Sequence, residues 1–125
     1  MFNYATSMVV LGTSIALIAA SQLLMKWRMT ALVADGAATT RRDMLAMALF
    51  DPWVWLCAAF ILASAVLWYI AMSRLPLSFM MPLAACTAPI VAVGAALLFG
   101  ETLSAMHMAA IGLIAVGVAW LGMLQ

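Results

Sequence analysis

The stretch that decides the fold is YATSMVVLGTSIALIAASQLLMKWR, at residues 4–28. It has no charged side chain before Lys26, and the whole segment from Phe2 to Met25 is uncharged. A helix needs roughly 20 apolar residues to cross the hydrocarbon core of a bilayer. We therefore expect a transmembrane helix over about residues 4–25, which stops on the cations Lys26 and Arg28.

Three further segments meet the same requirement, at about residues 52–73, 77–99 and 103–124. The chain has 125 residues, of which 70% are hydrophobic and 7% charged, a balance far outside that of soluble domains. The four spans use nearly the whole chain. The sequence therefore predicts an all-α integral membrane protein, a four-transmembrane-helix bundle that forms a single domain over residues 1–125.

The only substantial connection lies between the first two spans and holds most of the charged residues. Its ADGAATT stretch at 34–40 is typical of a turn, and RRDMLAMALF at 41–50 is expected to form a short helix lying in the membrane interface. Asp51 and Pro52 then predict the N-cap and first residue of the second helix. The other connections are short, so consecutive helices should pack antiparallel.

Basic residues are distributed unevenly between the two sides of this bundle. The first connection holds four of the five Lys and Arg residues, and Arg74 lies on the opposite side. The positive-inside rule favours a cytoplasmic first connection with both termini outside. Dual topology, or an antiparallel partner, is an open alternative.

Polar side chains form a line along the first span. Ser7, Ser14 and Ser21 recur every seven residues and Gln22 flanks them, so they share one face of a helix. Either the serines bond carbonyls of their own helix and Gln22 bonds a neighbouring helix, or this face lines a polar path. The roughly opposite face carries small residues suited to close helix packing, namely Gly12, Ala16 and Ala19.

The third span contains Pro82 and Pro89, which are seven residues apart and so lie on one face. Each proline lacks an N–H and frees the carbonyl four residues earlier, which here belongs to Ser78 or Ala85. A helix broken in this way is a candidate for the wall of a cavity that opens and closes. A static kink is the alternative.

The fourth span has a face of small residues that suits close helix packing, within the protomer or between protomers. Its members are Ala105, Ala109, Gly112, Ala115, Ala119 and Gly122. Four short helices bury little lateral surface, so we expect an oligomer with this face as its interface. At the start of this span, Glu101 is expected to complement the helix dipole and His107 to lie at the membrane interface.

Composition also argues against several classes of function. A net charge of +1 argues against nucleic acid as a partner. No ionisable residue lies near the middle of a span, where a proton-coupled transporter usually carries one. The sequence offers no nucleophile with a base and no metal-ligand cluster, so we expect neither an enzyme nor a cofactor or metal site. Cys57 and Cys86 are expected to be buried thiols.

Three segments of the chain resemble a known group of transporters. They are SQLLMK at 21–26, LWYIAMSRLPLSFMMPLAA at 67–85 and LLFGETLSAMHMAAIGLIAVGV at 97–118. With the four-helix plan, they look like the small members of the drug/metabolite transporter superfamily, which are small multidrug resistance-like or EamA-like. The small multidrug resistance transporters carry a membrane-embedded Glu eight residues before the Lys that ends their first helix. Here that position is Ile18.

The closer likeness is to the paired small subunits that flip aminoarabinose-phosphoundecaprenol across the inner membrane for lipid A modification. Gln22 and Pro82 match features of those subunits. The resemblance implies a multi-pass protein of the bacterial inner membrane that binds a polyprenyl-phosphate-linked sugar as a homodimer or heterodimer. It implies that Lys26 and Arg28 bind the phosphate, although ordinary positive-inside anchoring would explain the two cations equally well. It also implies that Gln22, Ser21 and Ser14 line the sugar path and that the segment from Pro82 to Pro89 moves.

Two alternatives to a flippase or flippase subunit are left open. One is a small-solute or drug exporter of the small multidrug resistance type. The other is a membrane partner that does not transport anything and packs against a larger complex through the small-residue face of the fourth span.

Overall fold

Helices make up nearly all of the structure, a computed structural model that describes residues 3–36 and 40–124. No strand occurs among these residues. The helices are α1 (Tyr4–Ala34), α2 (Arg41–Phe50), α3 (Pro52–Met72), α4 (Leu77–Ala84), α5 (Thr87–Phe99) and α6 (Ala105–Met123). The predicted all-α fold is confirmed. Residues 37–39 of the expected turn at 34–40 lie outside the described residues.

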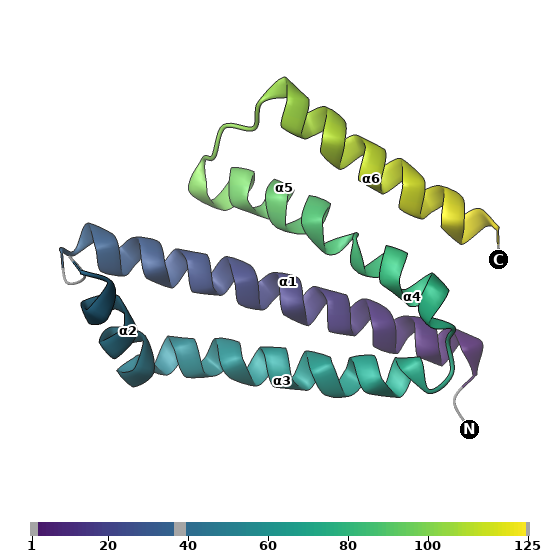
Figure 1. The fold of residues 1–125 in the computed structure, drawn as a ribbon, viewed down its shortest axis with the longest axis horizontal. Coiled ribbons are helices and arrows are strands. Elements are labelled where there is room, and N and C mark those ends of the chain that lie inside the picture. The colour runs from purple at the N-terminus through teal and green to yellow at the C-terminus, as the bar shows by residue number, and fades with distance from the viewer. Residues whose placement is uncertain (1–2, 37–39, 125) are drawn as a thin grey trace.

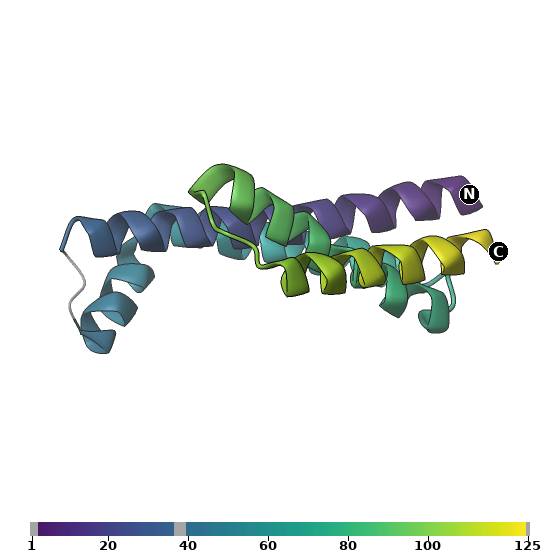
Figure 2. The ribbon, with the colours of Figure 1, turned by 90° about the horizontal axis from the view of Figure 1, so that it is seen from above.

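Four stretches of the described chain are long and apolar enough to cross a membrane: α1, α3, the joined α4 and α5, and α6. This is a multi-pass membrane protein. The helices lie in the order α3, α1, α4 with α5, and α6 (Figure 1). The start of α1 and the end of α6 lie at the same end of the molecule (Figure 1). The short helix α2 contacts α3 and turns away from the long axis that the other helices share (Figure 2).

The first helix differs from the expectation at its C-terminal end. It continues through Ala34 instead of ending near Met25, so Lys26 and Arg28 lie inside a helix. Residues 26–34 contain no glycine or proline, and nothing in them breaks a helix. The helix ends at Ala34, two residues before the first glycine that follows, Gly36, whose φ of 66° is in the left-handed region that favours glycine.

The boundaries of α2 and α3 agree with the sequence. Helix α2 covers residues 41–50, as expected from its charged start and apolar body. The side chain of Asp51 accepts a hydrogen bond of 2.9 Å from the backbone N–H of Trp53, with Pro52 in the first turn, so the expected N-cap of α3 is present.

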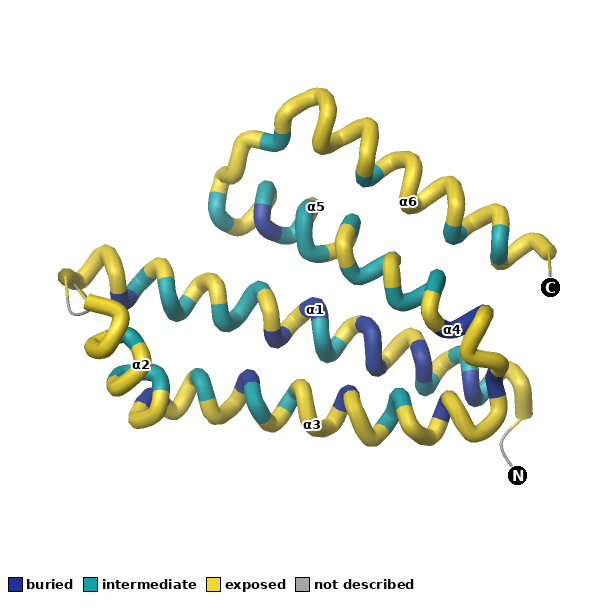
Figure 3. Tube along the Cα trace, in the orientation of Figure 1, coloured by how far each residue is buried: buried dark blue, intermediate teal, exposed yellow. Residues whose placement is uncertain are grey.

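The best-packed region lies where the first half of α1 meets the end of α3 and the start of α4. Its buried apolar side chains are Leu11, Ile15, Ala71, Leu75 and Met80. Met8, Val10, Trp68 and Leu83 pack around them. Burial falls away from this cluster toward α6, which has no fully buried residue (Figure 3). The α1–α3 contact is therefore the best-buried part of the described protomer, and α6 is its most exposed helix.

Candidate functional site

The centre of the α1–α3 contact is a pair of serines. Ser14 Oγ donates to the carbonyl oxygen of Ser64, and Ser64 Oγ donates to the carbonyl oxygen of Ser14, each at 2.9 Å. The two hydroxyl oxygens are also 2.9 Å apart. Both residues are 1% exposed. Ser14 therefore bonds the neighbouring helix, and for this serine the alternative of a bond within its own helix is wrong.

This pair belongs to two matching series of small residues. Ser7, Ser14 and Ser21 are buried on α1, and Cys57, Ser64 and Ala71 are buried on α3. Both series have a spacing of seven, which keeps each on one side of a helix. With Ser14 opposite Ser64, an antiparallel register brings Ser7 opposite Ala71 and Ser21 opposite Cys57. The serine line is thus the packing face of α1.

The face expected to pack is instead largely open. Gly12 and Ala16 are exposed, and a Cβ added to Gly12 would meet nothing within 4 Å, although Ala19 is buried. Serine is small enough to allow close helix approach, and its hydroxyl can bond across the contact. The serine face therefore suits packing better than the Gly12 face does. Ser21 donates to the carbonyl of Ile18 at 2.7 Å, within its own helix.

An apolar groove of about 380 Å³ opens beside the serine pair. It lies between α1, α3 and α4, near the middle of the apolar spans. Its lining is formed by Ser14, Ile18, Ile61, Ser64, Ala65, Trp68, Met81 and Ala84. The two serine hydroxyls are already hydrogen-bonded to α1 and α3, so the groove presents mainly hydrocarbon and one indole ring.

The third span is interrupted where it borders this groove. Helix α4 ends at Ala84 and α5 begins at Thr87, so the break lies between Pro82 and Pro89 as the sequence predicts. The Ala85 carbonyl, which loses its usual donor at Pro89, accepts from the N–H of Ala88 at 3.1 Å. Through the break, hydrogen bonds between residues three apart, as in a 3₁₀-helix, replace the regular α-helical bonds between residues four apart. Whether the segment moves stays a prediction.

Lys26 and Arg28 each pair with a carboxylate, but on different elements. Lys26 forms an ion pair with Glu101, on the connection between α5 and α6, and its Nζ lies 5.7 Å from the centre of the Phe99 ring. Arg28 Nε donates to Asp51 Oδ2 at the start of α3. The two cations therefore tie α1 to the α5–α6 connection and to the start of α3. Their role as phosphate ligands stays a prediction.

The Arg28 pair lies in a small packed junction between α1 and α3. The Asp51 side chain is only 4% exposed and also caps α3. Burial alone would raise the pKa of the Asp51 carboxyl, but hydrogen bonds from Arg28 and the Trp53 N–H, with the charge of Arg28, hold this pKa below its ordinary value. The rings of Trp27 and Trp53 meet edge to face beside it, with centroids 5.5 Å apart.

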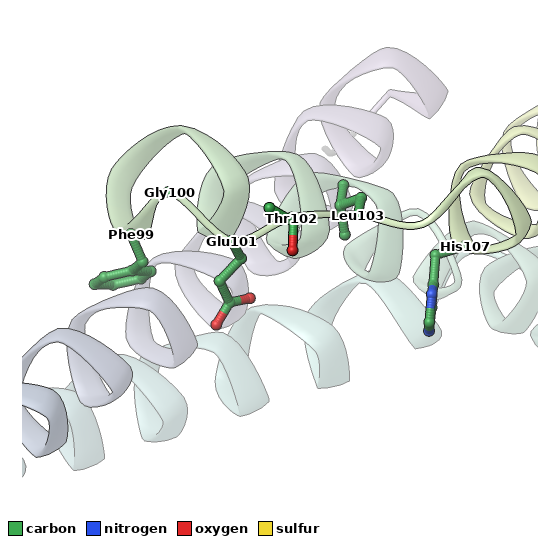
Figure 4. A pocket seen from close by; sticks show the side chains of 6 residues that line it. All are labelled: Phe99, Gly100, Glu101, Thr102, Leu103 and His107. Carbon is green, nitrogen blue, oxygen red and sulfur yellow. The ribbon is translucent and has the colours of Figure 1, made fainter.

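A polar hollow of about 620 Å³ lies at the end of α5 and the start of α6 (Figure 4). Phe99, Gly100, Glu101, Thr102, Leu103 and His107 line it. Gly100 ends α5 with a left-handed φ of 64°, and residues 101–104 are not helical. Ser104 caps α6 by accepting from the N–H of His107 at 3.3 Å, and its hydroxyl lies 2.6 Å from His107 Nδ1.

Glu101 does not sit at the helix end that the sequence suggested. Ser104 caps α6, and Glu101 turns to Lys26 instead of complementing the α6 dipole. Sequence reasoning missed this pairing because the two residues are far apart in the chain. It also missed Ser64, although the seven-residue spacing of Cys57, Ser64 and Ala71 was available as a signal. Gln22 is exposed on α1.

The small-residue face of α6 points away from its own bundle. The half-buried residues of α6 are Ile111, Val118 and Leu121, and the six small residues of the predicted interface are all exposed. A Cβ added at Gly112 or Gly122 would meet nothing within 4 Å. Nothing in the described protomer covers this face.

Comparison with known proteins gives no relative. No protein-family model, no curated protein and no solved structure matches the chain.

Proposed function

We propose that this protein is a membrane transporter, a flippase or flippase subunit for an amphiphile with an anionic head. The substrate class is a polyprenyl-phosphate-linked sugar or a similar anionic glycolipid. Its transfer across the bacterial inner membrane would serve modification of the cell envelope or of lipid A. The observation that carries the proposal is the apolar groove at membrane depth, which directly borders the interruption of the third span.

The lining of the groove favours a lipid chain over a water-soluble solute. A polar solute that leaves water must find hydrogen-bond partners, or its transfer costs several kcal/mol. The only hydroxyls in the lining, those of Ser14 and Ser64, already bond each other's helices. An apolar tail needs no such partner. The volume of about 380 Å³ is within the usual range of small-molecule sites, so the groove can hold part of a long chain.

The C-terminal third of α1, which carries Lys26, suits the anionic head of such a substrate. Lys26 lies eight residues beyond Ile18 of the groove, which is about 12 Å along α1, because an α-helix rises about 1.5 Å per residue. Its ammonium is partly exposed, beside the polar hollow at Glu101. An anionic head could therefore lie at Lys26 while its tail occupies the groove and the surrounding lipid.

Transbilayer movement in proteoliposomes tests this proposal. A fluorescent polyprenyl-phosphate sugar is incorporated in both leaflets, and dithionite removes fluorescence only from the outer one. We expect vesicles with the protein to lose nearly all fluorescence, and protein-free vesicles to lose only the outer-leaflet share. A wild-type result equal to that of protein-free vesicles would contradict the proposal.

Two alanine variants provide a matched pair for this assay. Ala65 and Ala63 are both exposed on α3, but only Ala65 lines the groove. Leucine at position 65 would fill part of the groove, so Ala65→Leu should slow the movement and Ala63→Leu should leave it unchanged. Equal rates in the two variants would show that the groove takes no part.

The proposed partner is a second copy of this chain or a related small subunit, seated on the small-residue face of α6. The exposure of that whole face favours an oligomer. Gly112 lies on the face and Gly117 about 140° around the helix, and an added Cβ meets nothing at either position. Gly112→Leu should therefore reduce the oligomer measured by native mass spectrometry and Gly117→Leu should not. An unchanged oligomer in Gly112→Leu would place the interface elsewhere.

A further inference from the structure

The ion pair between Lys26 and Glu101 joins the C-terminal third of α1 to the connection that leads from α5 to α6. Its side chains are 46% and 40% exposed. Such a pair contributes little to stability, because both charges remain well hydrated. Either partner can therefore be exchanged for another group of the same charge at small cost.

The neighbouring pair of Arg28 and Asp51 is different. The Asp51 carboxylate is nearly buried and also holds the N-terminus of α3 through the Trp53 N–H. Taking Arg28 away would leave a buried charge without its partner, which is strongly unfavourable. Of the two cations predicted to bind a phosphate, only Lys26 can change partners without disturbing a helix end.

The segment that carries Glu101 can change position more readily than a helix can. It begins at Gly100, with a left-handed backbone, and residues 101–103 lie outside any helix, before Ser104 caps α6. The polar hollow of about 620 Å³ lies along this same segment and provides space beside Glu101 (Figure 4). A phosphate group offers several acceptor oxygens to the three donors of a lysine ammonium.

We infer that Glu101 is an internal competitor for the anion site at Lys26. The anionic head of the substrate replaces the Glu101 carboxylate on Lys26, and its arrival releases the α5–α6 connection from α1. The head therefore cannot bind Lys26 while Glu101 holds the α5–α6 connection to α1. The inference rests on the proposed function and adds to it how the head site is regulated.

Binding of dodecyl phosphate to the protein in dodecyl maltoside micelles tests the competition, with the fluorescence of Trp27 and the other tryptophans as the signal. Glu101→Gln removes the competitor, so its apparent Kd should be about two- to fivefold lower than that of the wild type, the factor that corresponds to an exposed ion pair. Lys26→Gln should lose most of the binding. An equal or higher Kd in Glu101→Gln would overturn the inference.

The exchanged variant, with Lys26→Glu and Glu101→Lys together, separates binding from structure. It restores an ion pair between α1 and the connection but moves the cation to a different backbone position. We expect it to keep the wild-type fold and to bind dodecyl phosphate weakly. Binding as tight as that of the wild type would mean that the order of the charges is irrelevant, and the inference would fail.

A distance measurement follows the release itself. Spin labels at Val33 and Met106, both exposed, report the separation of α1 and α6 after Cys57 and Cys86 are replaced by alanine. Dodecyl phosphate should lengthen or broaden the distance distribution, Glu101→Gln should do so without ligand, and the exchanged variant should not. An unchanged distribution with bound dodecyl phosphate would refute the release.

The two proposals fail in different ways. If dodecyl phosphate competes with Glu101 but no polyprenyl-phosphate lipid is moved, the competition holds and the proposed function is wrong. If the lipid is moved and Glu101→Gln has no effect on the Kd, the proposed function holds and the competition is wrong.

Discussion

Replacing Ser14 by alanine removes one half of the hydrogen-bonded pair that joins α1 to α3. The Ser14 hydroxyl has one proton, which it donates to the carbonyl of Ser64. In Ser14→Ala this bond is lost, but Ser64 Oγ still donates to the carbonyl of residue 14. Each single replacement by alanine thus removes one interhelical hydrogen bond and leaves the other.

The magnitude follows from what such bonds contribute in membranes. An interhelical hydrogen bond there averages about 0.6 kcal/mol, with a maximum of about 1.7 kcal/mol. We expect Ser14→Ala and Ser64→Ala each to cost about 0.6 kcal/mol and the double variant about 1.2 kcal/mol. Ser14→Leu should cost more, about 1–3 kcal/mol beyond the lost bond, because the site is 1% exposed within the α1–α3 contact and leucine has two more heavy atoms than serine.

Cys57 provides a reporter for this measurement because it is buried in the same α1–α3 contact. In a Cys86→Ala background, its reaction with a maleimide dye is followed through an SDS titration, and the free energy of unfolding is compared between variants. Thr13→Ala is the matched control, since Thr13 is exposed and its hydroxyl bonds only its own helix at the Val9 carbonyl. A cost above about 2 kcal/mol for Ser14→Ala, or none for Ser14→Leu, would refute the reasoning.

Two further predictions concern the other contacts of α1. A Cβ at Gly94 would lie 2.7 Å from Cδ1 of Leu23, the end of a flexible side chain that can rotate away. Gly94→Ala should therefore leave the melting temperature nearly unchanged. Gly94→Val should lower it, whereas Gly117→Val should not, because a Cβ at Gly117 meets nothing within 4 Å. For Asp51, the folded pKa lies below its ordinary value of 3.8, so its contribution to stability is present above that value and is lost as the pH falls through the folded pKa. Asp51→Asn keeps an N-cap residue but not the charge that pairs with Arg28, so its unfolding free energy should be lower than that of the wild type at pH 7 and the difference should shrink below about pH 4. Asp51→Ala, which also loses the cap, should be less stable than Asp51→Asn at both pH values, and equal stability would contradict the cap.

Local properties of the chain were predictable. The four spans follow from the length of uncharged apolar segments, because a bilayer leaves the backbone no partner other than its own helix. The limits of α2, the cap at Asp51 and the break between Pro82 and Pro89 depend on residues next to one another in sequence. The end of α1 was misjudged because Lys26 marks a change in polarity, and a helix does not have to end where its apolar stretch ends.

The contacts between helices were harder to predict from the sequence. Periodicity places Ser7, Ser14 and Ser21 on one face, but it does not say which neighbour covers that face. The matching spacing on α3, at Cys57, Ser64 and Ala71, would have indicated the partner had the two helices been compared. The pairing of Lys26 with Glu101 depends on how α5 lies against α1. No local pattern in either segment contains that information.

Native mass spectrometry of the purified protein with its co-isolated lipids tests the central claim most directly. The account predicts that the wild type and Ala63→Leu retain a polyprenyl-phosphate lipid, and that Ala65→Leu, in the groove, and Lys26→Ala, at the head, retain much less of it. Gln22→Ala measures whether that exposed amide contributes. A wild-type spectrum without such a lipid, or equal retention in Ala65→Leu, Lys26→Ala and the wild type, would contradict the claim that the groove and Lys26 bind the lipid.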